Sequence, residues 1–422
     1  MSSRHFCWVN SMKDRKKPAI RFKGFTEDWE QRKFADVVQI ERGGSPRPID
    51  AYTTDSSSGL NWVKIGDAPT QGHYITKTVE KIKPEGLSKT REVHPGDLIL
   101  SNSMSFGKPY IMGIDGCIHD GWLLIRNINN TFDLTFLCHL LGTPQMLGQY
   151  KSLAAGSTVN NLNKELVGNT VVTIPEIDEQ RVLGQYLERL DHLITLHQRK
   201  YDKLVNVKKS MLEKIFPKNG ESIPDIRFSG FTEDWEHRKL SELCFLVTKG
   251  TTPLDKSSIG TVNFVKIESI DEVSGEIKIM QKITDEEHNG YLRRSQLKKG
   301  DILFSIAGTL GRVTAVKSGI LPANTNQALA IIRLKSGCLQ YIKTYLKGKA
   351  VADFIKENPT IGAQPNLSLE QVGNLEISLP TENEQKFIGA YFQHLNNLIT
   401  LHQRKLEKLK NIKKSCLEKM FI

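Results

Sequence analysis

The chain has 422 residues, a formal net charge of +11 and 25% charged residues. Its length allows two sizeable cores, and its basic excess suits a polyanionic partner such as nucleic acid, although a merely basic soluble protein carries the same charge. Six cysteines without a C-x-x-C pair predict reduced packing residues, so we expect a cytoplasmic protein without a disulfide framework or zinc site. No apolar run approaches the roughly 18 residues of a membrane span.

The first module opens at Pro18. Short apolar runs bounded by Gly, Pro or Asp predict strands near residues 29–34, 60–65, 97–100, 111–114, 123–128 and 171–174. Helical spacing of leucines predicts a helix over residues 132–153. A long helix begins around Asp178, after Pro175 interrupts the chain.

The second module repeats this order. Residues 20–30 recur almost unchanged as residues 226–236, and residues 179–216 recur as 384–421 with 23 of 38 positions identical. We expect strands near 264–267, 300–304, 331–334 and 375–379 and a helix over 339–355. A period near 200 residues indicates a duplicated domain, not a solenoid. The segments 71–91 and 279–297 do not align, which suits two recognition modules with different targets; neutral drift of loops is the alternative.

The boundaries follow from the repeats. We expect an N-terminal extension (1–17), a first recognition domain (18–177), a first long helix (178–216), a linker (217–224), a second recognition domain (225–382) and a second long helix (383–422). The predicted fold class is α+β.

Both long helices carry an unbroken 4-3 spacing of mostly apolar residues, which is typical of a coiled-coil seam. Parallel pairing would place Lys208 opposite Lys413 and His197 opposite His402. Antiparallel pairing places each lysine opposite a leucine, where a lysine near a helix end can extend to water. We therefore predict an antiparallel, pseudo-two-fold helix pair with the two domains at its opposite ends. Its central seam comprises Leu190, Ile194, His197, Tyr201, Leu204, Lys208, Leu395, Ile399, His402, Leu406, Leu409 and Lys413.

Known catalytic patterns are missing from the sequence. It has no G-x-G-x-x-G after a strand, no G-x-x-x-x-G-K-[ST], no H-E-x-x-H and no G-x-S-x-G. The D/N/S-P-P-Y/F/W pattern of amino-methyltransferases is also missing. We predict a non-catalytic chain without a metal or cofactor of its own.

Four motifs occur twice in the same order: Phe-x-Gly-Phe…Trp-Glu, the loops Gly-Gly-Ser-Pro and Gly-Thr-Thr-Pro, Gly-Asp-Leu/Ile, and Pro…Glu-Gln before the long helix. This arrangement resembles the DNA-specificity subunit of type I restriction–modification systems over residues 18–421. The resemblance implies that each module reads one half of a bipartite, asymmetric DNA site and that the helices set the spacing. It also implies methyltransferase and motor–nuclease partner subunits, which use S-adenosylmethionine, ATP and Mg²⁺. The first module departs from the family where His119-Asp120-Gly121-Trp122 replaces an Asn-Thr-Asn-Gln segment.

Loop-borne polar and basic side chains supply the donors that DNA phosphates and base edges need. On that basis the candidate DNA contacts are Ser45, Arg47, Lys64, Ser101, Asn102, Lys108, Asn160 and Asn161 in the first module, and Thr252, Lys266, Ser305, Arg312, Asn326, Gln327, Gln364 and Asn366 in the second. Each of them could also be a solvated loop residue or a turn-former.

Two other functions remain open at this point. A stand-alone DNA methyltransferase or nuclease with an undetected site would bind S-adenosylmethionine or cleave DNA by itself. A helical protein–protein adaptor would show no salt-sensitive, sequence-selective DNA binding.

Overall fold

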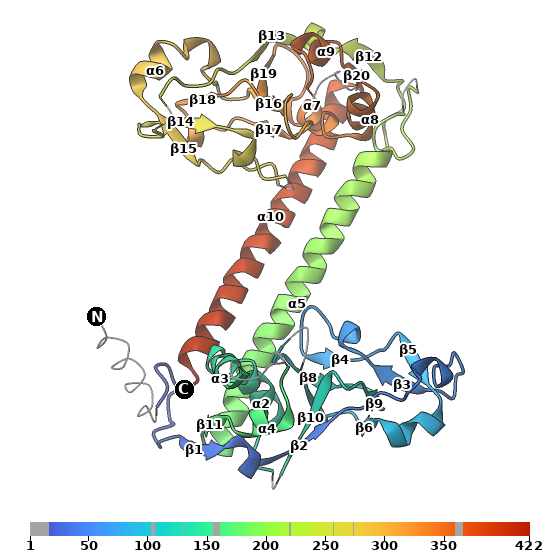
Figure 1. Ribbon diagram of the computed structural model, residues 1–422. Helices are drawn as coiled ribbons and strands as arrows, with labels where there is room; N and C mark the ends of the chain where they lie inside the picture. Colours follow the sequence, from blue (N-terminus) through green and yellow to red (C-terminus); the bar gives the residue numbers. More distant parts are fainter. Residues whose placement is uncertain are drawn as a thin grey trace. The chain divides into compact units, whose positions relative to one another are not determined.

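The computed structural model describes residues 17–102, 106–128, 130–154, 161–218, 221–255, 257–272, 274–358 and 366–422. They form two compact units, the first ending at Gln198 and including Lys405–Ile422, the second comprising Arg199–Arg404. The long helices α5 (Ile177–Lys214) and α10 (Glu382–Lys419) each contribute one part to each unit (Figure 1). Among the described helices, none combines the length and apolar character needed to cross a bilayer.

The described residues of the first unit form three sheets. The largest has the order β2-β10-β7-β8-β4, with strands β2 (Val38–Arg42), β10 (Trp122–Asn127), β7 (Leu98–Ser101), β8 (Pro109–Met112) and β4 (Tyr74–Ile75). The second has the order β5-β3-β9-β6, with β5 (Glu80–Ile82), β3 (Leu60–Val63), β9 (Gly116–Ile118) and β6 (Arg91–Val93). Strands β1 (Glu30–Lys33) and β11 (Val171–Ile174) pair antiparallel in the third.

Strands β7 and β8 and most of β10, in the largest sheet, are buried on both faces. Leu98 and Leu100 belong to a core that also includes α2 (Leu134–Leu141), whereas Ile99 between them belongs to a second core with Trp122 and Leu124. Side chains alternate between the faces of a strand, so a run of apolar residues without alternation is required when both faces are covered. This explains the compact apolar runs of the sequence.

The helix predicted over residues 132–153 is two helices, α2 and α3 (Pro144–Ala154). Asp133 caps α2 by accepting a hydrogen bond from the Phe136 amide at 2.9 Å, and Gly142 ends the helix. Pro144 then occupies the first turn of α3, where its missing N–H costs nothing. A short helix, α4 (Lys164–Gly168), is capped by Asn163.

The second unit repeats most of this topology, but its described residues form no strands equivalent to β4 and β6. Its sheets have the orders β13-β19-β16-β17, β15-β14-β18 and β12-β20. The strands are β12 (Glu236–Lys239), β13 (Cys244–Lys249), β14 (Val262–Val265), β15 (Gln281–Ile283), β16 (Ile302–Ser305), β17 (Val313–Ala315), β18 (Ala323–Thr325), β19 (Leu329–Leu334) and β20 (Glu376–Leu379). Its helices are α6 (Asp285–Asn289), α7 (Leu339–Tyr345), α8 (Lys349–Glu357) and α9 (Leu369–Gly373). As in the first unit, a single predicted helix, over 339–355, is divided, here at Gly348.

A buried ion pair joins the opening motif to the long helix in each unit. The guanidinium of Arg21 donates to both carboxylate oxygens of Glu179, each at 2.7 Å, and Arg227 donates to Glu384 at 2.9 and 2.7 Å. The adjacent glutamine, Gln180, accepts a hydrogen bond from the Asp133 amide at the start of α2. These contacts explain why the opening motif and the Glu-Gln pair are repeated together.

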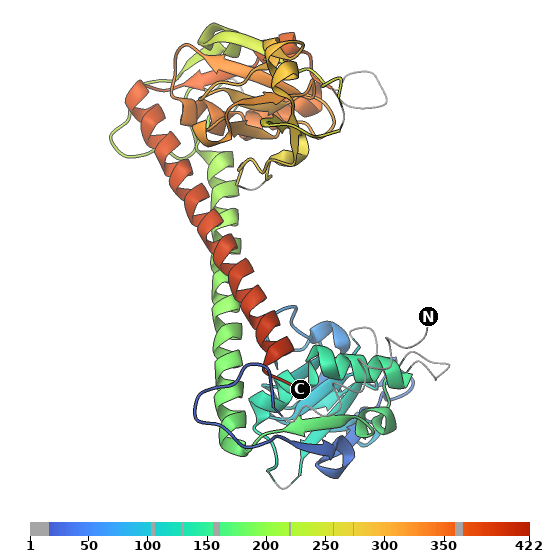
Figure 2. The ribbon, with the colours of Figure 1, turned by 90° about the vertical axis from the view of Figure 1, so that its left-hand side faces the viewer.

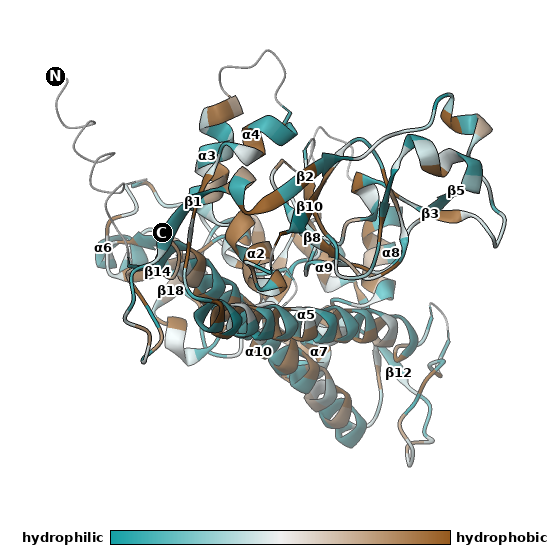
Figure 3. Cartoon of the chain, turned by 90° about the horizontal axis from the view of Figure 1, so that it is seen from below, coloured by the Kyte–Doolittle hydropathy of each residue, from teal (hydrophilic) through white to brown (hydrophobic). Residues whose placement is uncertain are grey.

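Within each unit the start of one long helix lies against the end of the other, so their antiparallel orientation is confirmed. In the first unit the end of α10 lies beside α5 (Figure 2). Leu183, Leu187 and Leu190 of α5 pack there in a core with Leu409 and Cys416 of α10. In the second unit Ile388, Phe392 and Leu395 of α10 pack with Leu204 and Met211 of α5. The hydrophobic and hydrophilic residues of both helices are seen in Figure 3.

Candidate nucleic-acid interface

Loops at one end of the large sheet of the first unit converge. Gly43, directly after β2, donates its amide to the Trp122 carbonyl at 2.9 Å, and a side chain at Gly43 would collide with the backbone of His119. Two residues later the Ser45 hydroxyl donates to the Asp120 carboxylate at 2.9 Å. The loop after β2 and the loop before β10 are therefore held together by backbone and side-chain bonds.

A third loop and a fourth segment join them. The Asn102 side-chain amide donates to the Asp120 carbonyl at 2.8 Å, and the Asn102 carbonyl accepts from the Leu162 amide at 3.0 Å. The exposed residue Asn161 lies beside this contact in sequence. Ser45, Asn102, Asp120 and the segment at Asn161 thus form one cluster, termed the first loop cluster.

The second unit has an equivalent arrangement. Gly250 donates to the Leu329 carbonyl at 3.2 Å, and the Thr252 hydroxyl is hydrogen-bonded to Gln327. The segment at Asn366 joins through an isolated bridge between Asn366 and Ala307. The second loop cluster therefore consists of Thr252, Asn326, Gln327 and Asn366. Asp120 is the structural equivalent of Gln327 in the first cluster. The Asp120 side chain accepts a hydrogen bond from the Ser45 hydroxyl, as the Gln327 side chain does from the Thr252 hydroxyl.

Three predicted DNA contacts are buried. Ser101 and Ser305 are 0% exposed, and Asn102 is 2% exposed. The Ser101 hydroxyl accepts from the Lys108 amide at 2.9 Å, and the Ser305 hydroxyl accepts from the Arg312 amide at 2.7 Å. This corrects the expectation of direct DNA contact. The polar groups of these side chains are hydrogen-bonded within the protein, where they stabilise the loops that carry the exposed residues.

The basic candidates lie at three further places. Lys108 is exposed after the buried serine, whereas the Arg312 guanidinium donates to the carbonyls of Ile267 and Ile270 at 3.3 Å. Lys64 and Lys266 follow equivalent strands, β3 and β14, and the Lys64 ammonium pairs with Glu80. Arg47 is exposed beyond the first loop cluster. Asn160 and Gln364 lie outside the described residues.

Sequence reasoning missed Asp120. Its side chain is about one-third exposed beside His119. The first module lacks the Asn-Thr-Asn-Gln segment, and the residue was therefore assigned no role. The sequence did carry a signal for this role. Ser45 and Thr252 lie at equivalent positions in the two glycine-containing loops, so their hydroxyl groups should have equivalent hydrogen-bond partners on the neighbouring segment.

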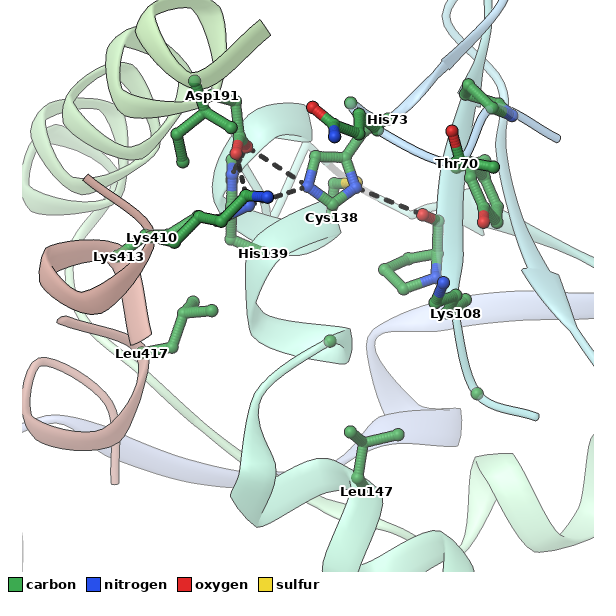
Figure 4. A pocket seen from close by; sticks show the side chains of 18 of the residues that line it. Thr70, His73, Lys108, Cys138, His139, Leu147, Asp191, Lys410, Lys413 and Leu417 are labelled. Atoms are coloured by element: carbon green, nitrogen blue, oxygen red, sulfur yellow. Dashed lines mark hydrogen bonds and ion pairs between the residues drawn. The ribbon is translucent and has the colours of Figure 1, made fainter. Parts of the chain in front are cut away.

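A separate cavity of about 690 Å³ lies in the first unit, between β8, α2 and both long helices. At its wall the Asp191 carboxylate accepts from Lys413 and lies 2.9 Å from Nε2 of His139 and 3.2 Å from Nε2 of His73 (Figure 4). Lys413 was predicted to face Leu190. It instead pairs with the next residue, Asp191, so an ionic contact fixes the two helices in register.

Asp191, Lys413, His139 and His73 together form an ionic cluster, and their interactions shift the pKa values of Asp191 and His73. Burial raises the pKa of Asp191, but the hydrogen bonds from His139 and His73 and the Lys413 charge outweigh burial and hold it well below its usual range. Burial lowers the pKa of His73, but the interactions with Asp191 and Cys138 together outweigh burial and raise this pKa to about 10. His73, His139 and Asp191 could also offer three metal ligands. The Lys413 ammonium already neutralises the carboxylate, which favours a structural role.

The variant Asp191→Asn should lower the free energy of unfolding by about 3 kcal/mol near pH 6, because it leaves buried cations without their counter-ion. The contribution of Asp191 is present above its unfolded pKa near 4 and is lost as pH falls below that value. The contribution of His73 is complete below about pH 6.5 and is lost as pH rises towards 10. The difference between native and variant protein, measured by urea unfolding, should therefore shrink from pH 6 to pH 10. A difference independent of pH would contradict this account of the cluster.

Comparisons with known proteins bear on the family and the fold of the chain. A family model described as the type I restriction modification DNA specificity domain matches residues 26–206 and 232–411. The MjaVIII type I restriction enzyme specificity subunit of Methanocaldococcus jannaschii is 24% identical over 412 residues, covering 92% of this chain and 91% of that protein. The crystal structure of the S subunit of a type I restriction–modification system from M. genitalium has a TM-score of 0.59 at 14% identity, covering 96% of this chain and 99% of that one. A chain from a structure on the complex assembly of the type I R-M system has a TM-score of 0.51 at 17% identity, covering 93% and 97%.

Proposed function

Because the chain belongs to the type I restriction–modification DNA specificity domain family, we propose that each of its two units reads one half of a bipartite, asymmetric site in double-stranded DNA. The two long helices set the spacing of the half-sites and dock two methyltransferase subunits. The adenine methylation and the ATP-dependent motor and nuclease reactions belong to partner subunits, which hold S-adenosylmethionine, ATP and Mg²⁺. This chain supplies recognition.

The observation that carries the proposal is a shared scaffold with different tips. Both units hold the loop after the first strand of their main sheet by a glycine amide bonded to the opposite strand. At the tip, however, the first unit presents the acceptor-only carboxylate of Asp120, and the second presents the amide of Gln327. A carboxylate accepts a hydrogen bond from cytosine N4, whereas a glutamine amide can bond adenine at two positions. The two units are therefore equipped to prefer different bases, and the net charge of +11 favours the DNA backbone.

Reciprocal isosteric substitutions test this assignment. Asp120→Asn and Gln327→Glu change the donor and acceptor pattern of one tip with little change in volume. With the methyltransferase subunits bound, each variant should alter base preference in its own half-site only, by about 1–3 kcal/mol at the affected base pair. Selection from a random duplex library, followed by sequencing, measures both halves at once. Unchanged preferences in both variants would remove these residues from base recognition, and a change in the wrong half would contradict the division of labour.

A further inference from the structure

The loops that follow β2 and β13 have the same plan in the two units. Ser45 and Thr252 are 207 positions apart, and the hydroxyl of each donates a hydrogen bond to a side chain on the neighbouring loop. A buried proline follows in both loops, Pro46 in the first unit and Pro253 in the second. The position directly after this proline is therefore equivalent in the two units.

That position carries different chemistry in the two units. In the first unit it is Arg47, an exposed residue and a candidate DNA contact. In the second unit it is Leu254, whose apolar side chain is 70% exposed. Isolated exposed leucines are common on protein surfaces and by themselves indicate nothing. Leu254 differs from them because it stands directly beside the second loop cluster, at the place of a candidate DNA contact.

The backbone of Leu254 is held although its side chain is exposed. Oε1 of Glu287, in α6, accepts hydrogen bonds from the Leu254 amide at 2.7 Å and from the Asp255 amide at 3.0 Å. The Asp255 carboxylate in turn accepts from the amide and the hydroxyl of Ser257, at 2.8 and 2.7 Å. A loop that is ordered in advance loses little conformational entropy on binding, so its contacts contribute more to affinity.

The side chain beside Leu254 indicates which base it would meet. Leu254 is two residues from Thr252, so their Cα atoms are at most about 7 Å apart, and Thr252 is hydrogen-bonded to Gln327. Successive bases of one strand are about 3.4 Å apart along the DNA axis, so Leu254 can reach the base pair that Gln327 meets or a neighbouring one. Glutamine bonds adenine in the major groove, where thymine, the partner of adenine, presents an apolar 5-methyl group.

We propose that Leu254 is a specificity-determining residue that contacts the 5-methyl group of a thymine in the half-site read by the second unit. This inference rests on the proposed function and adds a base contact to it. Glu287 acts as a positioning residue, because it holds the backbone that carries Leu254. The equivalent Arg47 offers donors that suit guanine instead, so this position adds to the difference between the two half-sites.

Replacement of single thymines by uracil tests the proposal, since uracil lacks only the 5-methyl group. Binding of the full-length chain with its methyltransferase subunits would be measured on duplexes that each carry one uracil in the recognised site. One such replacement in the second unit's half-site should weaken binding about 4-fold, as expected for one methyl group removed from an apolar contact. The variant Leu254→Ala should bind the thymine and uracil duplexes equally at that position. Leu254→Met keeps an apolar side chain of similar volume and should keep the discrimination.

Phe245→Ala is the matched control. Phe245 is 75% exposed but lies near the start of β13, roughly 16 Å along the strand from Gly250, so its loss should leave the discrimination unchanged. Glu287→Ala releases the Leu254 amide and should bring the ratio of thymine to uracil affinity towards one. Glu287→Gln keeps an oxygen that can accept this amide and should keep the ratio of the native protein.

The outcomes separate this inference from the function on which it rests. If no thymine of the second half-site is sensitive to uracil, or if the sensitivity persists in Leu254→Ala, the inference is overturned while selection of a bipartite site still supports the proposed function. Loss of the sensitivity in Phe245→Ala would also overturn it. Failure of the native complex to select any bipartite site would overturn the proposed function, and this inference with it.

Discussion

A fragment comprising residues 1–218 will form a two-fold homodimer. Removal of α10 exposes the apolar residues Leu183, Leu187 and Leu190 of α5. It also exposes the rings of Trp29 and Phe136, against which Phe421 packs in the intact chain. A second copy of α5 can replace what is lost, because Phe216 corresponds to Phe421. The dimer would carry two first units, and with methyltransferase subunits it should modify an interrupted palindrome built from one half-site.

The ionic cluster predicts that the two halves of the chain differ in how strongly they dimerise. In the homodimer Lys208 of each copy meets Asp191 of the other, as Lys413 does in the intact chain. A fragment comprising residues 221–422 has Asn396 at the position of Asp191 and cannot form this pair. It should therefore dimerise roughly 100-fold more weakly. Light scattering with size-exclusion chromatography over a concentration series measures both. A folded, monomeric 1–218 fragment would show that the helices do not pair in this way.

The variant Arg227→Leu will destabilise the second unit by about 3–5 kcal/mol, because it leaves a buried carboxylate without its cation. Glu384 has 0% of its side chain exposed and receives two hydrogen bonds from Arg227. The double variant Arg227→Leu/Glu384→Leu should recover most of this loss, since no charge then remains buried. Denaturant unfolding followed by hydrogen exchange of the second unit measures the effect.

Arg238→Leu is the matched control. Arg238 pairs with Glu236 at the surface, where both side chains are more than half exposed, so its loss should change stability by less than about 1 kcal/mol. Equal effects of Arg227→Leu and Arg238→Leu would show that the buried pair does not connect the opening motif to α10 energetically.

The repeats and the long helices could be predicted from the sequence, because both are visible as periodic patterns of residues. Their antiparallel orientation could also be predicted, because parallel pairing would place lysine opposite lysine. The partner of Lys413 could not. Asp191 follows Leu190 and so falls beside the apolar seam, and His73 comes from a loop that does not align between the modules. Only the packed structure brings these three side chains together.

The candidate site was predicted unevenly for a related reason. The loops after β2 and β13 were identified from glycine and proline, whose backbone requirements are local. Ser101 and Ser305 were misassigned because a serine at the end of a strand has the same sequence signature whether its hydroxyl faces DNA or a backbone amide. Asp120 was missed because its role depends on its distance from Ser45, 75 positions earlier.

Exchange of residues 225–383 for the corresponding segment of another family member tests the central claim most directly. Methylated adenines would be mapped across the genome of cells that express the chimera with its methyltransferase subunits. We expect the half-site read by the second unit to change. The half-site read by the first unit should stay the same. A change in both half-sites, or in neither, would contradict the assignment of one half-site to each unit.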